Sequence, residues 1–280
     1  MANPAINPLS GHFRQPAIYL KLPSRGHFYP DNGIDLPVTG DIPVYPMTVR
    51  DELTLKTPDA LMNGVGVINV IKSCCPNIRD PWNMPAVDLD PIFIAIRLAS
   101  YGKGMDISCT CLHCKTSDDY TIDLTVILDG LEQADYSTPV KIDGLTFNFR
   151  PQTYRDLNQA GLITYEEQRL VDSIVRNEEL SQDEKTAQFN ASFEKLRQMN
   201  VDSVTVSIDS IETEDKIVVK DRAQIAEFLY QCSRQVYSNI KEHIQSLVDT
   251  FKVKPLKITC KDCKKEFENT LTFNQSNFFE

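Results

Sequence analysis

The sequence predicts an α+β fold, because strand-like and helical segments alternate along a chain of 280 residues. Strand–turn–strand patterns surround two Cys-x-x-Cys pairs that lie far apart, Cys111 with Cys114 and Cys260 with Cys263. Between the pairs, apolar residues recur at helical spacing in segments that open with helix-capping residues. We therefore expect an N-terminal mixed domain with a discontinuous four-cysteine zinc ribbon and a mainly helical insertion.

The two cysteine pairs match the ligand set of one structural zinc ion. Cys111, Cys114, Cys260 and Cys263 supply four thiolates, and alternating apolar residues lead into each pair as a strand would. Two other interpretations stay open: the pairs form disulfides, or the metal has been lost while the fold remains. Residues 1–11 lack the apolar core of a secretory signal, which favours reduced thiols and a metal.

The N-terminal part begins with an extended arm over residues 1–16, which has little to bury and orders only against a neighbour. Short strands are expected near 17–22 and 42–45. The segment 22–29 is dense in turn-forming residues, and two interpretations of it stay open. It is a binding loop, or it is a turn packed on its own domain. The side chains that it gathers are Arg25, His27, Phe28 and Tyr29.

The first predicted helix begins at Thr48, and Asp51 three residues later gives an acidic version of the capping box. This helix should end near residues 63–64, where asparagine and glycine stop it. A clearer helix starts at Asp90, the N-cap before a proline, and ends at Gly102. Its surface is apolar almost all round, so we expect it to be central and buried.

Arg97 is the exception on this helix. A buried guanidinium group needs a carboxylate or several carbonyl groups as partners, because an unpaired buried charge is costly. We therefore expect Arg97 to pair with an acid or to reach the surface at an interface.

After the first cysteine pair, residues 120–128 alternate as a strand. Residues 140–149 predict a β-hairpin with Asp143 and Gly144 at its turn, a pair that suits the required left-handed backbone. Capping boxes that open at Thr164 and Ser181 divide the following region into helices near 164–180 and 182–199.

The last part of the insertion should contain a strand over 204–208, which a second strand at 216–219 could pair with. Asp221 then caps a long helix that reaches about residue 250. The predicted domains are a core over 17–129 and 251–280, and an insertion over 130–250. The tail 274–280 is expected to be flexible or to dock its two phenylalanines in a neighbour's pocket.

Composition and motifs restrict the classes of function. The formal net charge of −10 argues against general nucleic-acid binding, and no apolar run approaches the roughly 18 residues that a membrane helix needs. The four histidines lie in no motif with a nucleophile, and no phosphate-binding or dinucleotide-binding glycine loop occurs. We expect no enzyme, no catalytic or cofactor-binding residue and no small-molecule substrate.

Several segments together resemble the baseplate hub proteins of T4-like contractile-tailed phages, over about residues 17–125. They are Leu22-Pro-Ser-Arg-Gly-His-Phe-Tyr29, Val44-Tyr-Pro-Met-Thr-Val-Arg-Asp-Glu-Leu53, Thr57-Pro-Asp-Ala-Leu61 and Asp90-Pro-Ile-Phe-Ile-Ala-Ile-Arg-Leu-Ala-Ser-Tyr-Gly102, followed by Cys-x-x-Cys. The resemblance implies a structural role in the tail baseplate, without catalysis and with other baseplate and tail proteins as partners. It implies a location in the virion, and in the host cytoplasm during assembly.

Two alternative functions stay open at this point. The chain could be an assembly factor of the same family that is not retained in the virion. It could also be a zinc-ribbon protein that binds nucleic acid, although its acidic charge and nearly neutral ribbon count against this.

Overall fold

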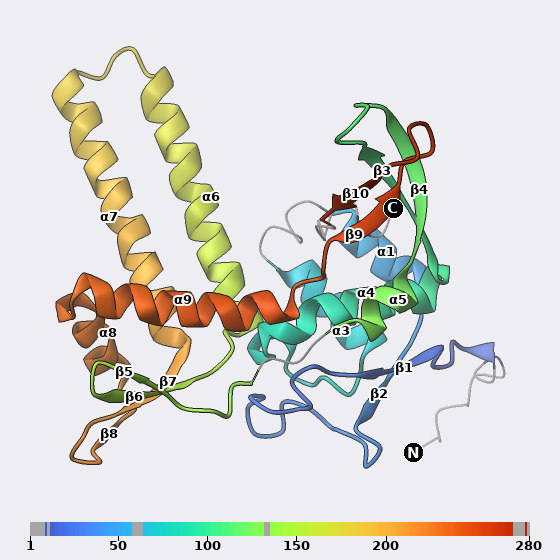
Figure 1. Cartoon of the computed structure of the whole chain (residues 1–280), viewed down its shortest axis with the longest axis horizontal. Helices are drawn as coiled ribbons and strands as arrows, with labels where there is room; N and C mark the ends of the chain where they lie inside the picture. The colour runs from blue at the N-terminus through green and yellow to red at the C-terminus, as the bar shows by residue number, and fades with distance from the viewer. Residues whose placement is uncertain (1–8, 10–11, 58–63, 132–134, 271–277, 279–280) are drawn as a thin grey trace, which may run out of the picture.

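The computed structural model describes residue 9, residues 12–57, 64–131 and 135–270, and residue 278. Helices and strands are mixed, as the predicted α+β fold requires. Figure 1 shows two parts side by side: a mixed part that carries two β-hairpins, and a part from which a pair of long helices projects. None of the helices in the described residues combines the length and the apolar character needed to cross a membrane.

The first part is built around one apolar helix. Its elements are strands β1 (Ile18–Lys21) and β2 (Asp41–Val44), helices α1 (Val49–Leu55), α3 (Val65–Cys74), α4 (Leu89–Tyr101) and α5 (Leu124–Asp129), and two 3₁₀ turns, η2 (Pro81–Asn83) and η3 (Ala86–Asp88). Strands β1 and β2 pair antiparallel. Residues 91–97 of α4 are all buried, so this helix is the centre of the first core, as its apolar sequence predicted.

The N-terminal helix is shorter than predicted. The capping box of Thr48 and Asp51 is confirmed, but α1 ends at Leu55, and residues 58–63 lie outside the described part of the chain. Gly64 does not end this helix; it precedes α3 with a φ of 75°. A Cβ atom at this position would lie 2.8 Å from the side-chain amide of Asn158, so glycine also permits a close approach of two segments.

Two β-hairpins carry the cysteine pairs. They are β3 (Gly104–Thr110) with β4 (Ser117–Asp123), and β9 (Leu256–Thr259) with β10 (Glu266–Asn269). The strand predicted over 120–128 is too long. It ends at Asp123, whose carboxylate accepts a hydrogen bond from the backbone N–H of Thr125 at 2.9 Å and so starts α5.

The second part contains an antiparallel sheet of four strands in the order β5–β6–β7–β8. These are β5 (Val140–Ile142), β6 (Leu145–Phe149), β7 (Ile208–Glu212) and β8 (Val218–Val219). The predicted hairpin turn is confirmed, because Asp143 and Gly144 have φ values of 51° and 79°.

Helices α6 (Tyr154–Arg176) and α7 (Gln182–Val206) form an antiparallel pair that projects from the second part, and we call this pair the arm (Figure 1). The predicted capping box at Thr164 is wrong. Its hydroxyl donates to the carbonyl of Ala160, one turn earlier in a continuous helix, while Thr153 with Asp156 caps the true start. The capping box at Ser181 is confirmed.

Two further boundaries differ from the prediction. Helix α7 continues through the strand expected at 204–208, so β7 begins only at Ile208. The long helix expected after Asp221 is two helices, α8 (Arg222–Gln231) and α9 (Arg234–Phe251). The break follows from a second N-cap, because the hydroxyl of Ser233 accepts a hydrogen bond from the backbone N–H of Val236 at 3.3 Å.

Three clusters of buried side chains hold the molecule together. One surrounds α4, a second lies between the four-stranded sheet and α7, α8 and α9, and a third joins the two cysteine hairpins. Removing a large aliphatic side chain from water stabilises the fold by roughly 1.5–3 kcal/mol. The proposed domain boundaries near 129 and 251 stay a prediction.

Both ends of the chain contact the first part. The guanidinium group of Arg14 donates to the carbonyls of Pro46 (2.5 Å) and Ser73 (2.7 Å) and lies 3.5 Å from the carboxylate of Asp51. Arg14, within the predicted N-terminal arm, therefore has partners in its own chain, and the extent of the arm over residues 1–16 stays a prediction.

The C-terminal end has an anchor as well. Phe278 is buried, and its carbonyl accepts a hydrogen bond from Arg97. The guanidinium group of Arg97 also lies 5.5 Å from the ring centroid of Phe278 and 5.4 Å from that of Tyr101. Phe278 thus packs within its own chain rather than in a neighbour's pocket, and the other residues of the tail predicted over 274–280 lie outside the described part.

Candidate metal centre

Each cysteine pair lies in a hairpin turn of the same design. In the first turn, the N–H of Cys111 donates to the carbonyl of Thr116 (2.9 Å) and the N–H of Lys115 donates back to Cys111 (2.9 Å). The second turn repeats both bonds between Cys260 and Lys265 (2.9 Å) and between Lys264 and Cys260 (3.1 Å). This repeated geometry is the structural form of the repeated sequence pattern.

In both turns the residue after the second cysteine has a left-handed backbone. The φ value is 63° at Lys115 and 61° at Lys264. This conformation is uncommon for a residue with a side chain. It closes each turn tightly and brings both sulfur atoms of a pair to the same side.

The four cysteine sulfur atoms converge although the pairs are far apart in sequence. The Sγ atoms of Cys111 and Cys263 lie 3.8 Å apart, and those of Cys114 and Cys260 lie 3.6 Å apart. All four Sγ atoms are within 4.8 Å of one another. A tetrahedral zinc ion with bonds of about 2.3 Å requires sulfur atoms about 3.8 Å apart. The donor set therefore fits zinc in number, element and spacing.

The same distances bear on the disulfide alternative. A disulfide bond joins two sulfur atoms at about 2.0 Å, and the two closest pairs in the cluster are separated by 3.8 and 3.6 Å. Among the described residues every cysteine is a free thiol. The arrangement is that of four ligands around a common centre, not of two bonded pairs.

Local hydrogen bonds favour the charged form of two of these thiols. The side chain and backbone of Thr116 lower the pKa of Cys114 to about 6. The backbone N–H of Cys263 lowers the pKa of Cys260. Burial and the hydrogen bonds with the neighbouring cysteine side chains raise the pKa of Cys263 to about 11 instead. Metals bind the thiolate form, so Cys114 and Cys260 favour a cation, whereas Cys263 would release a proton when a metal binds.

The contacts around the sulfur atoms hold the two hairpins in register. Tyr120 of β4 meets Phe267 of β10 edge to face, with ring centroids 6.2 Å apart. Lys261 lies over the ring of Tyr120 at 4.9 Å and bonds the carboxylate of Asp118 at 3.0 Å. Sequence reasoning missed this link, because nothing in the spacing of a lysine in one turn and an aspartate in a distant strand indicates that they meet.

Two further residues of types that bind metals lie near the cluster but outside it. Cys109 is buried in strand β3, and its sulfur accepts a hydrogen bond from the side-chain amide of Asn269 at 3.0 Å. His113 is exposed, and its Nε2 atom lies 3.1 Å from the carbonyl oxygen of Glu266. The four sequence-predicted cysteines form the single group of potential metal ligands found in the described part of the chain.

The chain was compared with known protein families and structures. Residues 21–280 match the family model described as T4 bacteriophage base plate protein. This match covers both cysteine hairpins and the arm between them, whereas the resemblance seen in the sequence stopped near residue 125. No curated protein and no solved structure matches the chain.

Proposed function

Because the chain belongs to the T4 bacteriophage base plate protein family, we propose that it is a structural component of the baseplate hub in a contractile phage tail. In this role it acts through protein–protein contacts during tail assembly, and its partners are other baseplate and tail proteins. The family match over residues 21–280 is the observation that carries this proposal. The protein resides in the virion and, before assembly is complete, in the host cytoplasm.

The shape of the molecule supports a role in contacts. The arm projects away from both cores, so most of its surface faces outward (Figure 1). It exposes large apolar side chains along its length, including Val175 near its far end and Phe193 near the middle of α7, which are 63% and 62% exposed. A single exposed apolar residue is ordinary, but their presence on a projecting element suits a surface that a neighbour covers.

The proposed metal is a structural zinc ion held by Cys111, Cys114, Cys260 and Cys263. Four thiolate ligands complete a tetrahedral site and leave no open position for water or substrate. Such an ion supplies a cross-link between the two hairpins rather than chemistry. The proposal accordingly assigns no catalytic residue, no small-molecule substrate and no nucleic acid to this chain.

A non-retained assembly factor is the alternative within the same family. Quantitative mass spectrometry of purified virions separates the two functions. A hub component is present in mature particles at a fixed ratio to the other baseplate proteins. If the protein occurs in assembly intermediates but is missing from mature particles, the hub assignment is wrong and the assembly role replaces it.

A genetic experiment tests the shared part of both functions. A phage with an early stop codon in this gene should produce heads but no complete, infectious tails, and the wild-type gene supplied in the host should restore them. Normal tails without the protein would contradict any role in the baseplate.

A further inference from the structure

One buried carboxylate holds the turn at residues 22–29 from beneath. Asp88 is fully buried and accepts hydrogen bonds from the backbone N–H of Ser24 (2.9 Å), the hydroxyl of Ser24 (2.5 Å) and the hydroxyl of Tyr29 (2.9 Å). The three bonds fix both ends of the turn. Its shape is therefore determined before any partner binds, which lowers the cost of binding.

The turn also has an unusual backbone. Arg25 and Phe28 have φ values of 52° and 68°, in the left-handed region that few residues with side chains adopt. Such backbone conformations persist only when the surrounding structure enforces them, and they concentrate at functional sites. Here the result is that Arg25, His27 and Phe28 line a hollow of about 660 Å³.

This hollow continues into a second cavity of about 440 Å³ between the first core and helices α7 and α9. Both hollows share the side chains of Val87, Tyr136 and Phe251, and we call the two together the trough. Tyr136 stacks on Phe251 with ring centroids 6.0 Å apart and meets Phe28 at 5.6 Å. The aromatic side chains thus form a common wall that runs from the turn to the foot of the arm.

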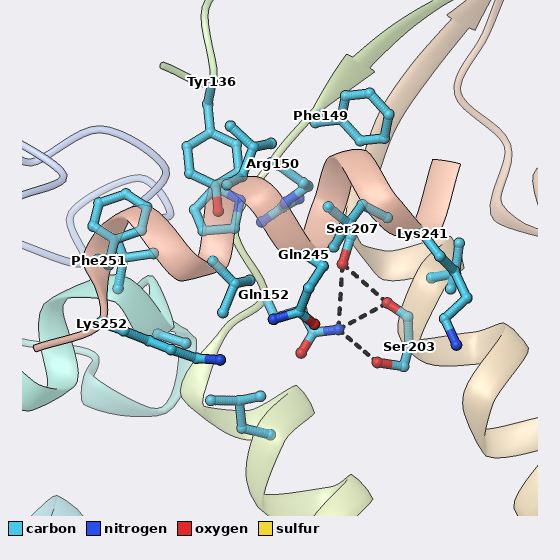
Figure 2. A pocket seen from close by; sticks show the side chains of 18 of the residues that line it. Tyr136, Phe149, Arg150, Gln152, Ser203, Ser207, Lys241, Gln245, Phe251 and Lys252 are labelled. Atoms are coloured by element: carbon cyan, nitrogen blue, oxygen red, sulfur yellow. Dashed lines mark hydrogen bonds between the residues drawn. The ribbon is translucent and has the colours of Figure 1, made fainter. Parts of the chain in front are cut away.

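The trough combines apolar walls with cationic groups. Figure 2 shows Arg150, Lys241 and Lys252 around the inner cavity, together with Tyr136, Phe149 and Phe251. The charged side chains that line the trough are Arg25, Arg150, Lys241 and Lys252 against Asp90 and Asp135. Four positive against two negative groups give a local charge of +2, in a chain whose net charge is −10.

Among the cationic side chains of the trough, one forms an ion pair within the chain and three do not. Lys252 pairs with Asp249 at 2.7 Å. Arg25, Arg150 and Lys241 make no side-chain hydrogen bond or ion pair in the part of the chain that the structure describes. Three cationic groups without internal partners, beside an aromatic wall, suit an anionic ligand that also has an apolar side chain.

We propose that the trough binds an extended segment of another baseplate protein, in which aspartate or glutamate flanks an aromatic or large aliphatic side chain. The apolar side chain fills the inner cavity, against the wall that Tyr136 and Phe251 form. The carboxylates meet Arg25 at the outer end and Arg150 with Lys241 at the inner end. This inference rests on the proposed function in the tail, because it identifies one of the contacts through which the protein acts.

A binding experiment with the purified full-length protein tests the chemistry. The probe is a fluorescein-labelled peptide with one phenylalanine among glutamates, followed by fluorescence anisotropy over a salt series. Its matched controls have lysine for glutamate, or alanine for phenylalanine. The glutamate peptide should bind at least about tenfold more tightly than either control, with an affinity that falls as salt rises. Equal binding of the glutamate and lysine peptides would overturn the proposal.

Variants locate the binding. Arg25→Gln and Lys241→Gln should each weaken the glutamate peptide by roughly threefold to fivefold, and Phe28→Ala by about tenfold. The matched controls Arg176→Gln and Phe193→Ala make the same changes on the arm and should leave binding unaltered. Arg25→Gln retains the turn's backbone and is decisive where Phe28→Ala disturbs folding. If the arm variants weaken binding and the trough variants do not, the site lies elsewhere.

Cross-linking in the assembled tail identifies the source of the segment. In one phage strain a benzophenone amino acid replaces Phe28, and in a control strain it replaces Phe193. The cross-linker is activated by light in infected cells. The expected product at position 28 is a peptide from a different baseplate protein that contains adjacent acidic and apolar residues. A cross-link at position 28 to a second copy of this chain, to nucleic acid, or to nothing would refute the proposal. If the protein still assembles into virions in that case, the baseplate function stands and only the trough assignment fails.

Discussion

Helix α4 and the arm are both helical, but they are stabilised in different ways. In α4 the residues from 91 to 97 are all buried. In the 23 residues of α6 three are buried, and one of these is Glu167, which bonds Lys195 of α7 at 2.6 Å. The first helix is held by burial of apolar surface, and the arm by capping boxes, cross-helix polar pairs and a few apolar contacts.

This difference in stabilisation indicates which sequence positions are constrained by folding. In α4 nearly every side chain is chosen by the core, so little of its sequence is left for contacts with partners. On the arm the outer positions are not needed for the fold, because caps at Thr153 and Ser181 and the Glu167–Lys195 pair hold the helices together. Its exposed surface is therefore free to vary with a neighbouring protein.

Loss of the proposed metal should give the largest difference in stability between the part of the molecule around α4, which carries the cysteine hairpins, and the arm. A structural zinc binds with roughly 10–16 kcal/mol in small peptides, which is comparable to the roughly 5–15 kcal/mol that stabilise a whole domain. The Cys111→Ser and Cys263→Ser double variant should lose its zinc and unfold the two hairpins at a lower temperature, while the arm keeps its helical circular dichroism.

Elemental analysis of protein purified without added metal should find close to one zinc ion per chain in the wild type and none in the double variant. Cys232→Ser, which alters a cysteine outside the cluster, is the matched control and should retain the zinc. Metal-free wild-type protein, or a disulfide between the two pairs in mass spectrometry, would contradict the proposed site.

Apolar truncations sharpen the same comparison. Ile94→Ala removes a fully buried side chain from α4 and should lower the free energy of unfolding by about 2–5 kcal/mol. Phe193→Ala removes a larger side chain from the surface of the arm and should change it by less than about 0.5 kcal/mol. Urea denaturation of both variants measures the difference. Similar losses would show that the arm packs against more of the molecule than its exposure indicates.

The free energy of unfolding should depend on pH with opposite signs at Asp88, beside α4, and at Glu167 in the arm. Burial raises the pKa of Asp88 to about 6, so the folded state binds this proton more tightly than the unfolded state does. Its contribution is present below the ordinary carboxyl pKa and falls by up to about 3 kcal/mol as pH rises from about 4 to 6. In the arm, the hydrogen bond from Lys195 lowers the pKa of Glu167, so its contribution is lost as pH falls below the ordinary carboxyl range.

Thermal midpoints between pH 3 and 7 check both signs, with Asp88→Asn and Glu167→Gln as the reporting variants. Asp88→Asn should remove the decline between about pH 4 and 6, and Glu167→Gln should remove part of the decline at lower pH. Wild-type pH profiles in both variants would show that neither carboxyl group titrates differently in the folded protein.

Arg97 should have the smallest effect of these buried groups. Its partners include the carbonyl of Phe278 and two aromatic rings, so Arg97→Ala removes a charged hydrogen bond and two cation–π contacts. The loss should be about 2 kcal/mol, from one charged hydrogen bond and the packing around it. Arg97→Lys tests whether the planar group matters, and a thermal midpoint equal to wild type in Arg97→Ala would show that the C-terminal contact contributes nothing.

Sequence patterns predicted the parts of the fold whose causes are local. The turn at Asp143 and Gly144, the caps at Thr48 and Ser181, and the buried character of α4 all follow from neighbouring residues. The predicted helix boundaries failed where two local signals compete. Thr164 has a capping pattern, but its helix continues because Thr153 already provides the cap about three turns earlier and the intervening residues favour helix.

The candidate metal centre was also predictable, because each turn repeats its own local pattern and zinc chemistry requires two such pairs. The contacts that support the centre were not, since Lys261 and Asp118 are separated by 143 positions and no periodicity connects them. The trough could not be predicted from the sequence either. Its walls come from the turn at 22–29, from Tyr136 and from α9, and only the folded chain brings these side chains together.

The separation of the two cysteine pairs along the sequence has a consequence for the synthesis of the protein. Cys111 leaves the ribosome 152 residues before Cys263. At about 5–20 residues per second, the first hairpin waits roughly 8–30 seconds with two thiols before the second pair is made. During that interval the whole arm is made and can fold on its own caps. The proposed ion gains its full set of four ligands only after Cys263 has been made, so metal uptake would report that the intervening arm has already been synthesised.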